Sequence, residues 1–201
     1  MSTASAGPPR LLNIANVLTA VRLALVPVFL YALLAENGAS TGWRLVAFGL
    51  FLLASVTDRL DGEIARRRGL VTSFGAVADP IADKALIGTA LVGLSMLGLV
   101  PWWITVIIMT REIGITVLRF AVLRHGVIPA SRGGKAKTLV QTLAIGLYLL
   151  PLTALVGAVD AIEAVQFSVL IAAVVLTVLT GIDYVIQAVR LRATAHLSDR
   201  P

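Results

Sequence analysis

The residues of this sequence best suited to chemistry are four aspartates at regular spacing, Asp58, Asp61, Asp79 and Asp83. On a helix that turns by 100° per residue, Asp58 and Asp61 share a sector about 140° wide, and Asp79 and Asp83 share a matching sector of a second segment. The rest of these sectors holds mainly small residues, which let a helix or a ligand come close. The other members of the sectors are Gly62, Ala65 and Arg66 in the first segment, and Gly75, Ala78 and Ala82 in the second.

Four carboxylates that converge would repel one another strongly, and divalent cations remove that repulsion. A ligand set made only of oxygen favours Mg²⁺, Mn²⁺ or Ca²⁺, and the chain has no cysteine that would favour zinc. Mg²⁺ in particular binds through carboxylates together with substrate phosphates. The aspartates therefore predict a divalent metal site that acts on a phosphorylated substrate. The alternative is that they are helix caps and solvated charges.

Pro80 leaves two possibilities for the second pair. Asp79 can share a helical face with Asp83, although a residue before proline avoids the helical region. Pro80 can instead be the first helical position, with Asp79 as the cap.

The composition indicates which elements must hold these residues. Hydrophobic residues make up 58% of the 201 residues, charged residues only 14%, and the mean hydropathy is +0.91. A soluble domain of this size could not bury so much apolar surface, and a disordered chain would be poor in apolar residues. A disulfide scaffold is excluded because cysteine is absent. The chain is therefore predicted to be an all-α integral membrane protein. Its net charge of +6 is attributed to membrane topology and anionic substrates, with no nucleic acid as a partner.

Six segments are long and apolar enough to be transmembrane helices. They are approximately Ile14–Leu34, Trp43–Thr57, Ile81–Leu99, Trp102–Val122, Leu139–Val159 and Val165–Val189. The expected organisation is a disordered N-terminal segment over 1–12, one transmembrane domain over 13–192, and a cytoplasmic tail over 193–201.

Lysine and arginine predict the orientation, because cytoplasmic loops are enriched in them. The connections after the second and fourth spans are basic, whereas the other connections have almost no positive charge. The basic side chains are Arg66, Arg67, Arg68, Arg124, Arg132, Lys135 and Lys137. Both termini and these loops are therefore expected in the cytoplasm of a cell that carries the protein in its inner or plasma membrane.

The acidic stretch reads Asp-x2-Asp-Gly-x2-Ala-Arg-x8-Gly-x3-Asp-x3-Asp, from Asp58 to Asp83. It resembles the signature of the CDP-alcohol phosphatidyltransferase family at every fixed position, and the six predicted spans fit the same family. The resemblance implies a homodimer that transfers a phosphatidyl group from CDP-diacylglycerol to an alcohol, with two Mg²⁺ or Mn²⁺ ions.

The resemblance also implies roles for individual residues. Asp58, Asp61 and Asp79 would ligate metal, and Asp83 would ligate a second ion, act as the catalytic base, or do both. The CDP-lipid would be bound by Asp58, Asp61, Gly62, Ala65, Arg66 and Gly75.

The flanking residues resemble those of family members that use glycerol 3-phosphate, and this resemblance implies the same acceptor here. They include Asn13–Thr19, Arg111-Glu112-Ile113 and Gly134–Thr138, with Ala15 standing where proline would be expected. Arg111 lies deep in the fourth span, and a buried guanidinium needs a partner. Glu112 points about 100° away on a helix and is judged a poor one.

An acceptor phosphate would suit Arg111, because arginine binds phosphate with two hydrogen bonds. Lys135 and Lys137 could complete this anion pocket, or could only enforce topology and contact lipid head groups. Asn16, Thr19 and Arg22 could line the pocket.

Two rivals remain at this point. A sister enzyme of the same family could use inositol phosphate, serine or phosphatidylglycerol as the acceptor. A divalent-cation transporter could use the aspartates as a permeation site, although transporters place such sites near the midplane of the membrane.

Overall fold

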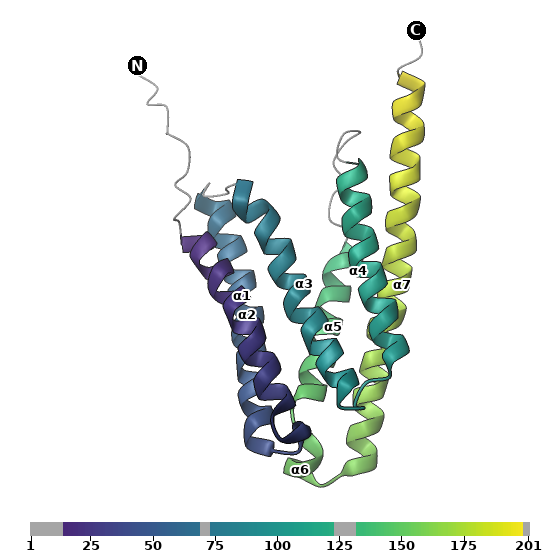
Figure 1. Ribbon diagram of the computed structural model, residues 1–201. Coiled ribbons are helices and arrows are strands. Elements are labelled where there is room, and N and C mark those ends of the chain that lie inside the picture. The colour runs from purple at the N-terminus through teal and green to yellow at the C-terminus, as the bar shows by residue number, and fades with distance from the viewer. Residues whose placement is uncertain (1–13, 69–72, 123–131, 199–201) are drawn as a thin grey trace. The chain divides into compact units, whose positions relative to one another are not determined.

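The computed structural model describes residues 14–68, 73–122 and 132–198, and within these ranges it describes the side chains of residues 17–58, 81–118 and 133–191. The N-terminal segment 1–12 predicted to be disordered lies outside the described residues. Every regular element in the described ranges is helical (Figure 1). The elements are α1 (Ile14–Leu34), η1 (Ala35–Gly38), α2 (Thr41–Arg68), α3 (Ser73–Met96), α4 (Trp102–Val122), α5 (Arg132–Leu149), α6 (Leu152–Val156) and α7 (Val159–Ser198).

The helices match the predicted spans to different degrees. α1 and α4 have the predicted bounds, Ile14–Leu34 and Trp102–Val122. The single helix predicted over Leu139–Val159 is wrong, because α5 ends at Leu149 and α6 is a separate helix of 5 residues. Pro151 explains the break, since proline has no N–H for the helical ladder and disfavours helical backbone in the residue before it. α6 then ends at Gly157, whose φ of 78° is left-handed.

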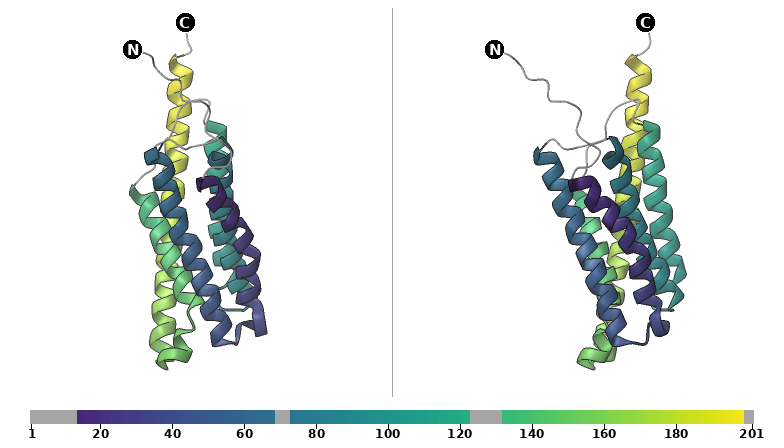
Figure 2. Two further views of the ribbon diagram at one scale, coloured as in Figure 1. Left: turned by 90° about the vertical axis from the view of Figure 1, so that its left-hand side faces the viewer. Right: turned by 60° about the vertical axis from the view of Figure 1, so that its left-hand side comes forward.

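The chain divides into two compact units, residues 1–93 and 94–201, with the division inside α3. In the first unit, α1 and α2 lie side by side and run in opposite directions (Figures 1 and 2). Their connection is short because Glu36 and Asn37 adopt left-handed backbone, with φ of 52° and 54°, before Gly38 at 70°. The Phe29 and Phe51 rings pack across the pair with their centroids 6.1 Å apart.

Gly93 brings α3 against α1 within this first unit. A Cβ added at Gly93 would lie 2.7 Å from Leu33 Cδ2 and 3.3 Å from Leu30 Cδ1. Any larger residue at this position would force Leu33 to shift, so glycine allows the observed approach.

In the second unit, α7 packs along α5 and also along α4 (Figure 2). Gln166 of α7 donates its side-chain N–H to the Leu147 carbonyl of α5 at 2.7 Å. Ser95 and Thr105 share a buried hydrogen bond of 2.7 Å between the end of α3 and the start of α4. Buried polar groups in this unit are thus used to join helices.

Two helical stretches in the described part of the chain are long and apolar enough to cross a membrane. They are Val17–Gly38 and Val159–Leu191, with mean hydropathies of 2.2 and 2.4. Only 28% of each stretch is buried, whereas a core helix of a soluble protein would be mostly buried. Large apolar side chains are exposed on both, for example Tyr31 at 68% and Val189 at 62%. These faces fit the membrane protein that the composition predicts.

Candidate functional site

The predicted metal ligands lie on two helices of the first unit. Asp58 and Asp61 are three residues apart in α2, and Asp79 and Asp83 are four residues apart in α3. Both helices are continuous over these positions, so each pair shares one side of its helix at the backbone level. The alternative in which Asp79 caps a helix that starts at Pro80 is wrong, because α3 begins at Ser73. The helix continues past Pro80 although proline forfeits one backbone hydrogen bond there.

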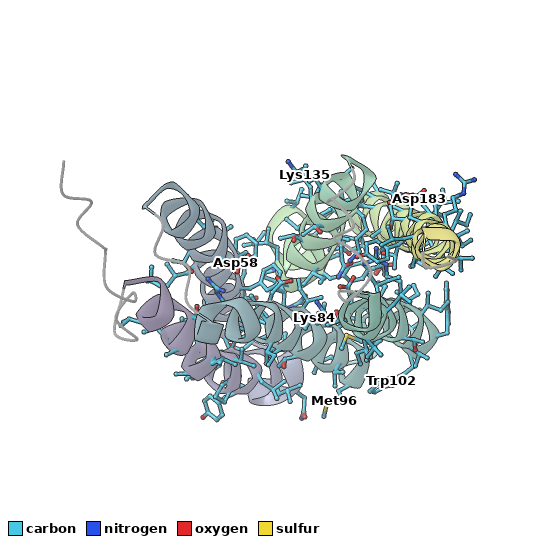
Figure 3. The ribbon with its side chains drawn as sticks, turned by 90° about the horizontal axis from the view of Figure 1, so that it is seen from above. Asp58, Lys84, Met96, Trp102, Lys135 and Asp183 are labelled. Atoms are coloured by element: carbon cyan, nitrogen blue, oxygen red, sulfur yellow. The ribbon has the colours of Figure 1, made fainter. Side chains whose placement is uncertain are left out.

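Asp58 is held by an arginine from a neighbouring helix. Arg22 Nη1 of α1 donates to Asp58 Oδ1 of α2 at 2.6 Å, a short distance typical of a charge-assisted bond. The Arg22 side chain is 1% exposed, whereas that of Asp58 is 35% exposed. Figure 3 shows Asp58 on α2. Burial of the guanidinium is possible because the carboxylate neutralises it.

Of the two other residues of α1 predicted to line the pocket, the structure describes the side chain of only one. Thr19 is buried at 1% exposure and lies one turn before Arg22. The side chain of Asn16 lies outside the described residues.

The rest of the predicted metal and nucleotide site is described only in part. Asp83 is partly exposed on α3 and directly precedes Lys84, which Figure 3 labels. The side chains of six predicted residues lie outside the described ones, namely those of Asp61, Gly62, Ala65, Arg66, Gly75 and Asp79. Among the described residues, no group of three or more His, Cys, Asp or Glu side chains could hold a metal ion. The donor chemistry still fits Mg²⁺ or Mn²⁺, since all four predicted ligands are carboxylates on two helices.

The second unit holds a buried cluster of charged side chains on α4 and α5, which also contacts α7. Arg111 Nη1 of α4 donates to Glu112 Oε1 at 3.1 Å, and Arg111 Nη2 donates to Thr180 Oγ1 of α7 at 3.2 Å. Lys137 Nζ of α5 donates to the same Glu112 oxygen. The side chains of Arg111, Glu112 and Lys137 are 18%, 13% and 5% exposed. Two cations therefore share one carboxylate oxygen in a largely water-excluded place.

This cluster corrects one prediction about the anion pocket and shows where its predicted lysines lie. The helical angle predicts that Glu112 is a poor partner for Arg111, but the two side chains are hydrogen-bonded. The 100° between their helical positions is overcome by the long, flexible arginine stem, which carries the guanidinium sideways. Lys135, predicted to join Arg111 and Lys137, extends outward from α5 as an exposed side chain (Figure 3). Lys137 is buried instead, because it faces the charged cluster.

Three buried polar atoms of this unit have no hydrogen-bond partner among the described residues. They are Arg111 Nε, Gln141 Oε1 of α5 and Thr177 Oγ1 of α7. Gln141 is 3% exposed and Thr177 is fully buried. Leaving such atoms unpaired is costly, so they are suited to a polar ligand or to water.

Sequence reasoning missed Glu112, Thr180 and Gly181 as members of this cluster. A Cβ added at Gly181 of α7 would lie 3.2 Å from Arg111 Cγ and 3.6 Å from Arg111 Nε. The spacing of Thr177, Thr180 and Gly181 along one helix, in an otherwise apolar span, is the signal that could have identified a polar face.

Comparison with known proteins adds independent information. The family described as CDP-alcohol phosphatidyltransferase matches residues 12–180. A probable phosphatidylglycerophosphate synthase of Mycobacterium tuberculosis (strain H37Rv) is 55% identical over 185 residues, which cover 92% of this chain and 86% of the relative. A CDP-diacylglycerol--glycerol-3-phosphate 3-phosphatidyltransferase of Bacillus subtilis is 37% identical over 152 residues, covering 69% and 77%. A cardiolipin synthase (CMP-forming) of Streptomyces coelicolor is 39% identical over 146 residues, covering 70% and 66%.

Proposed function

This chain is a member of the CDP-alcohol phosphatidyltransferase family, and we propose that it is a phosphatidylglycerophosphate synthase. It would transfer the phosphatidyl group of CDP-diacylglycerol to sn-glycerol 3-phosphate and release CMP. One observation carries the proposal: the complete acidic signature from Asp58 to Asp83 occurs in a chain 55% identical to a probable enzyme of this kind.

The proposed setting is the inner or plasma membrane, crossed six times with both termini in the cytoplasm. Basic connections alternate with connections that have almost no positive charge, which supports this orientation. The reaction would then take place at the cytoplasmic boundary, where the acyl tails of the CDP-lipid remain in the bilayer. Glycerol 3-phosphate and CMP would exchange with the cytosol. A homodimer is proposed from the family resemblance alone.

The chemistry is proposed to occur at α2 and α3. Divalent metal, when bound by Asp58, Asp61, Asp79 and Asp83, would neutralise the diphosphate and stabilise the leaving CMP. Asp83, a carboxylate of the acidic signature, would take the proton from the 1-hydroxyl of glycerol 3-phosphate. The oxygen of that hydroxyl then bonds to the phosphorus that carries diacylglycerol, and the bond from this phosphorus to the CMP oxygen breaks.

Binding of the CDP-lipid would depend on the residues around these carboxylates. Gly62, Ala65 and Gly75 would leave room for the nucleotide, and Arg66 would contact its phosphates. Arg22 would hold the Asp58 carboxylate in place through their 2.6 Å bond. The reaction then needs little more than orientation and electrostatic stabilisation.

The acceptor phosphate is proposed to bind at the buried cluster of the second unit. The hydrogen bonds of Arg111 to Glu112 and Thr180 use two of the five N–H groups of its guanidinium, and its Nε–H has no partner in the described part of the chain. Gln141 Oε1 and Thr177 Oγ1 also lack partners there, and they could serve the hydroxyl groups of a small polyol phosphate. Lys135 is exposed and would act in topology rather than in binding.

An acceptor screen tests the proposal. Purified protein would receive CDP-diacylglycerol and Mg²⁺ or Mn²⁺ with each alcohol in turn, and CMP release would be measured. Glycerol 3-phosphate is expected to give the highest rate. A higher rate with serine or inositol phosphate would overturn the assigned acceptor.

The second candidate is a cardiolipin synthase, which is favoured by the similarity to the Streptomyces coelicolor enzyme. In the same screen it would release CMP with phosphatidylglycerol and not with glycerol 3-phosphate. Metal uptake into liposomes without any CDP-lipid would instead indicate a cation transporter.

A further inference from the structure

Glu112 lies where two cations from different helices meet. Its Oε1 atom accepts from Arg111 of α4 and from Lys137 of α5, while the backbone carbonyl of Glu112 accepts from the Thr116 hydroxyl at 2.7 Å. The carboxylate therefore binds its neighbour Arg111 on α4 and reaches one other helix, α5, through Lys137. Neither cation could stay buried beside the other without an anion between them.

The two cations are constrained to different degrees. Arg111 also donates to Thr180 at 3.2 Å, and its stem lies against Gly181, so α7 limits its movement. Lysine has a flexible stem of four carbons and a head group that can rotate freely. Glu112 contacts both head groups, so it helps to set the position of the Lys137 ammonium relative to the guanidinium.

We infer that Glu112 is a positioning residue for the acceptor: its carboxylate holds the Lys137 ammonium and the Arg111 guanidinium at the spacing that one phosphate monoester needs. This inference rests on the proposed function, because it assumes that glycerol 3-phosphate binds at these cations. The three side chains together carry one net positive charge, two cations against one anion, so an acceptor dianion still finds an attractive site. Glu112 itself does not contact the reacting atoms.

The test is steady-state kinetics of Glu112→Gln with each substrate varied in turn. The amide oxygen accepts weaker hydrogen bonds than a carboxylate, so the two cations lose their fixed spacing. KM for glycerol 3-phosphate is expected to rise about tenfold, a loss of about 1.4 kcal/mol. The KM for CDP-diacylglycerol and kcat are expected to stay within about twofold of wild type, since a binding contact alone has changed. Glu112→Asp keeps the charge and should recover part of the loss.

A double variant shows whether Glu112 acts through Lys137. Lys137→Met alone should raise KM for glycerol 3-phosphate, and adding Glu112→Gln to it should raise KM by much less than Glu112→Gln does in the wild type. Glu163→Gln is the matched control, because it makes the same chemical change at an exposed carboxylate of α7 and should change nothing. Melting curves in detergent verify that each variant is folded.

The outcomes separate the two proposals. A wild-type protein that releases no CMP with glycerol 3-phosphate overturns the proposed function and this inference with it. An active wild type whose Glu112→Gln variant keeps or lowers KM for glycerol 3-phosphate overturns the inference alone. So does an equal rise in both KM values, which would indicate a general structural role. If Glu112→Gln does not fold, Glu112→Asp decides by the same comparison of KM values.

Discussion

Charged side chains meet at the α1–α2 contact and at the α4–α5 contact, but acidic residues are in excess at the first and basic residues at the second. In the first unit, one guanidinium meets Asp58, which has a further aspartate, Asp61, one helical turn along α2. In the second unit, one carboxylate, Glu112, meets the two cations Arg111 and Lys137. A helix face with several carboxylates suits a metal cation, whereas a cluster with surplus cations suits an anion. We therefore expect metal binding to depend on residues of the first unit, and binding of the acceptor phosphate to depend on residues of the second.

The largest expected effect is that of Asp83→Asn in the first unit. An amide cannot accept the proton of the acceptor hydroxyl, and loss of a general base typically costs about 10²–10⁴-fold in rate. CMP release that depends on glycerol 3-phosphate should therefore almost disappear, while the melting temperature stays near that of wild type. Asp183→Asn is the matched control, an exposed aspartate of α7 that hydrogen-bonds Gln187 at 2.8 Å. Full activity of Asp83→Asn would remove the assigned base from the first unit.

Arg22→Met should have the next largest effect, on stability. It leaves the Asp58 carboxylate without its 2.6 Å partner, and breaking a buried charged pair costs about 2 kcal/mol or more. We expect a cost near the lower end of this range, because Asp58 is 35% exposed and water can partly hydrate its carboxylate once Arg22 is removed. The melting temperature in detergent should fall by about 4–8 °C.

The double variant Arg22→Met with Asp58→Asn provides the control for this pair. It removes the uncompensated charge and should melt at a higher temperature than Arg22→Met alone. If the double variant is as unstable as the sum of both single variants, Arg22 stabilises the first unit by packing rather than by charge.

The sequence predicted the helices better than the contacts. The bounds of α1 and α4 agree with prediction because apolar runs that end at polar residues or aromatic anchors determine where such helices start and stop. The acidic signature placed the aspartates on two helices correctly. The break between α5 and α6 was not predicted, because Leu139–Val159 is predominantly apolar and hydropathy alone does not show that Pro151 interrupts the helix.

The contacts of Glu112 could not be found from positions on a helix. An angular argument treats each side chain as a vector from the axis, but arginine and glutamate are long enough to bend toward each other. Lys135 and Lys137 looked equivalent in the sequence, yet α5 exposes the first and buries the second. Which side of α5 faces α4 and α7 depends on tertiary packing, and the weak apolar periodicity of this helix does not reveal it.

A third and smaller effect is expected at Gly93, where the first unit is closely packed. The Cβ of Gly93→Ala would lie 2.7 Å from Leu33 Cδ2, and Leu33 is fully buried and cannot easily move away. Overpacking typically costs about 1–3 kcal/mol, partly offset by the roughly 1 kcal/mol helix preference of alanine. Gly49→Ala in α2 is the matched control, because nothing lies within 4 Å of its added Cβ. The melting temperature should fall for Gly93→Ala and hold or rise for Gly49→Ala.

The smallest effect is expected at Gly181, the corresponding close approach in the second unit. A Cβ there would lie 3.2 Å from Arg111 Cγ, so the arginine stem must shift by a few tenths of an ångström. Because the stem is flexible, Gly181→Ala should change the melting temperature little and raise KM for glycerol 3-phosphate about threefold. Gly114→Ala in α4 has nothing within 4 Å of the added Cβ and should leave this KM unchanged. If Gly181→Ala instead lowers stability as Gly93→Ala does, α7 serves packing at this point and does not orient Arg111 for an anion.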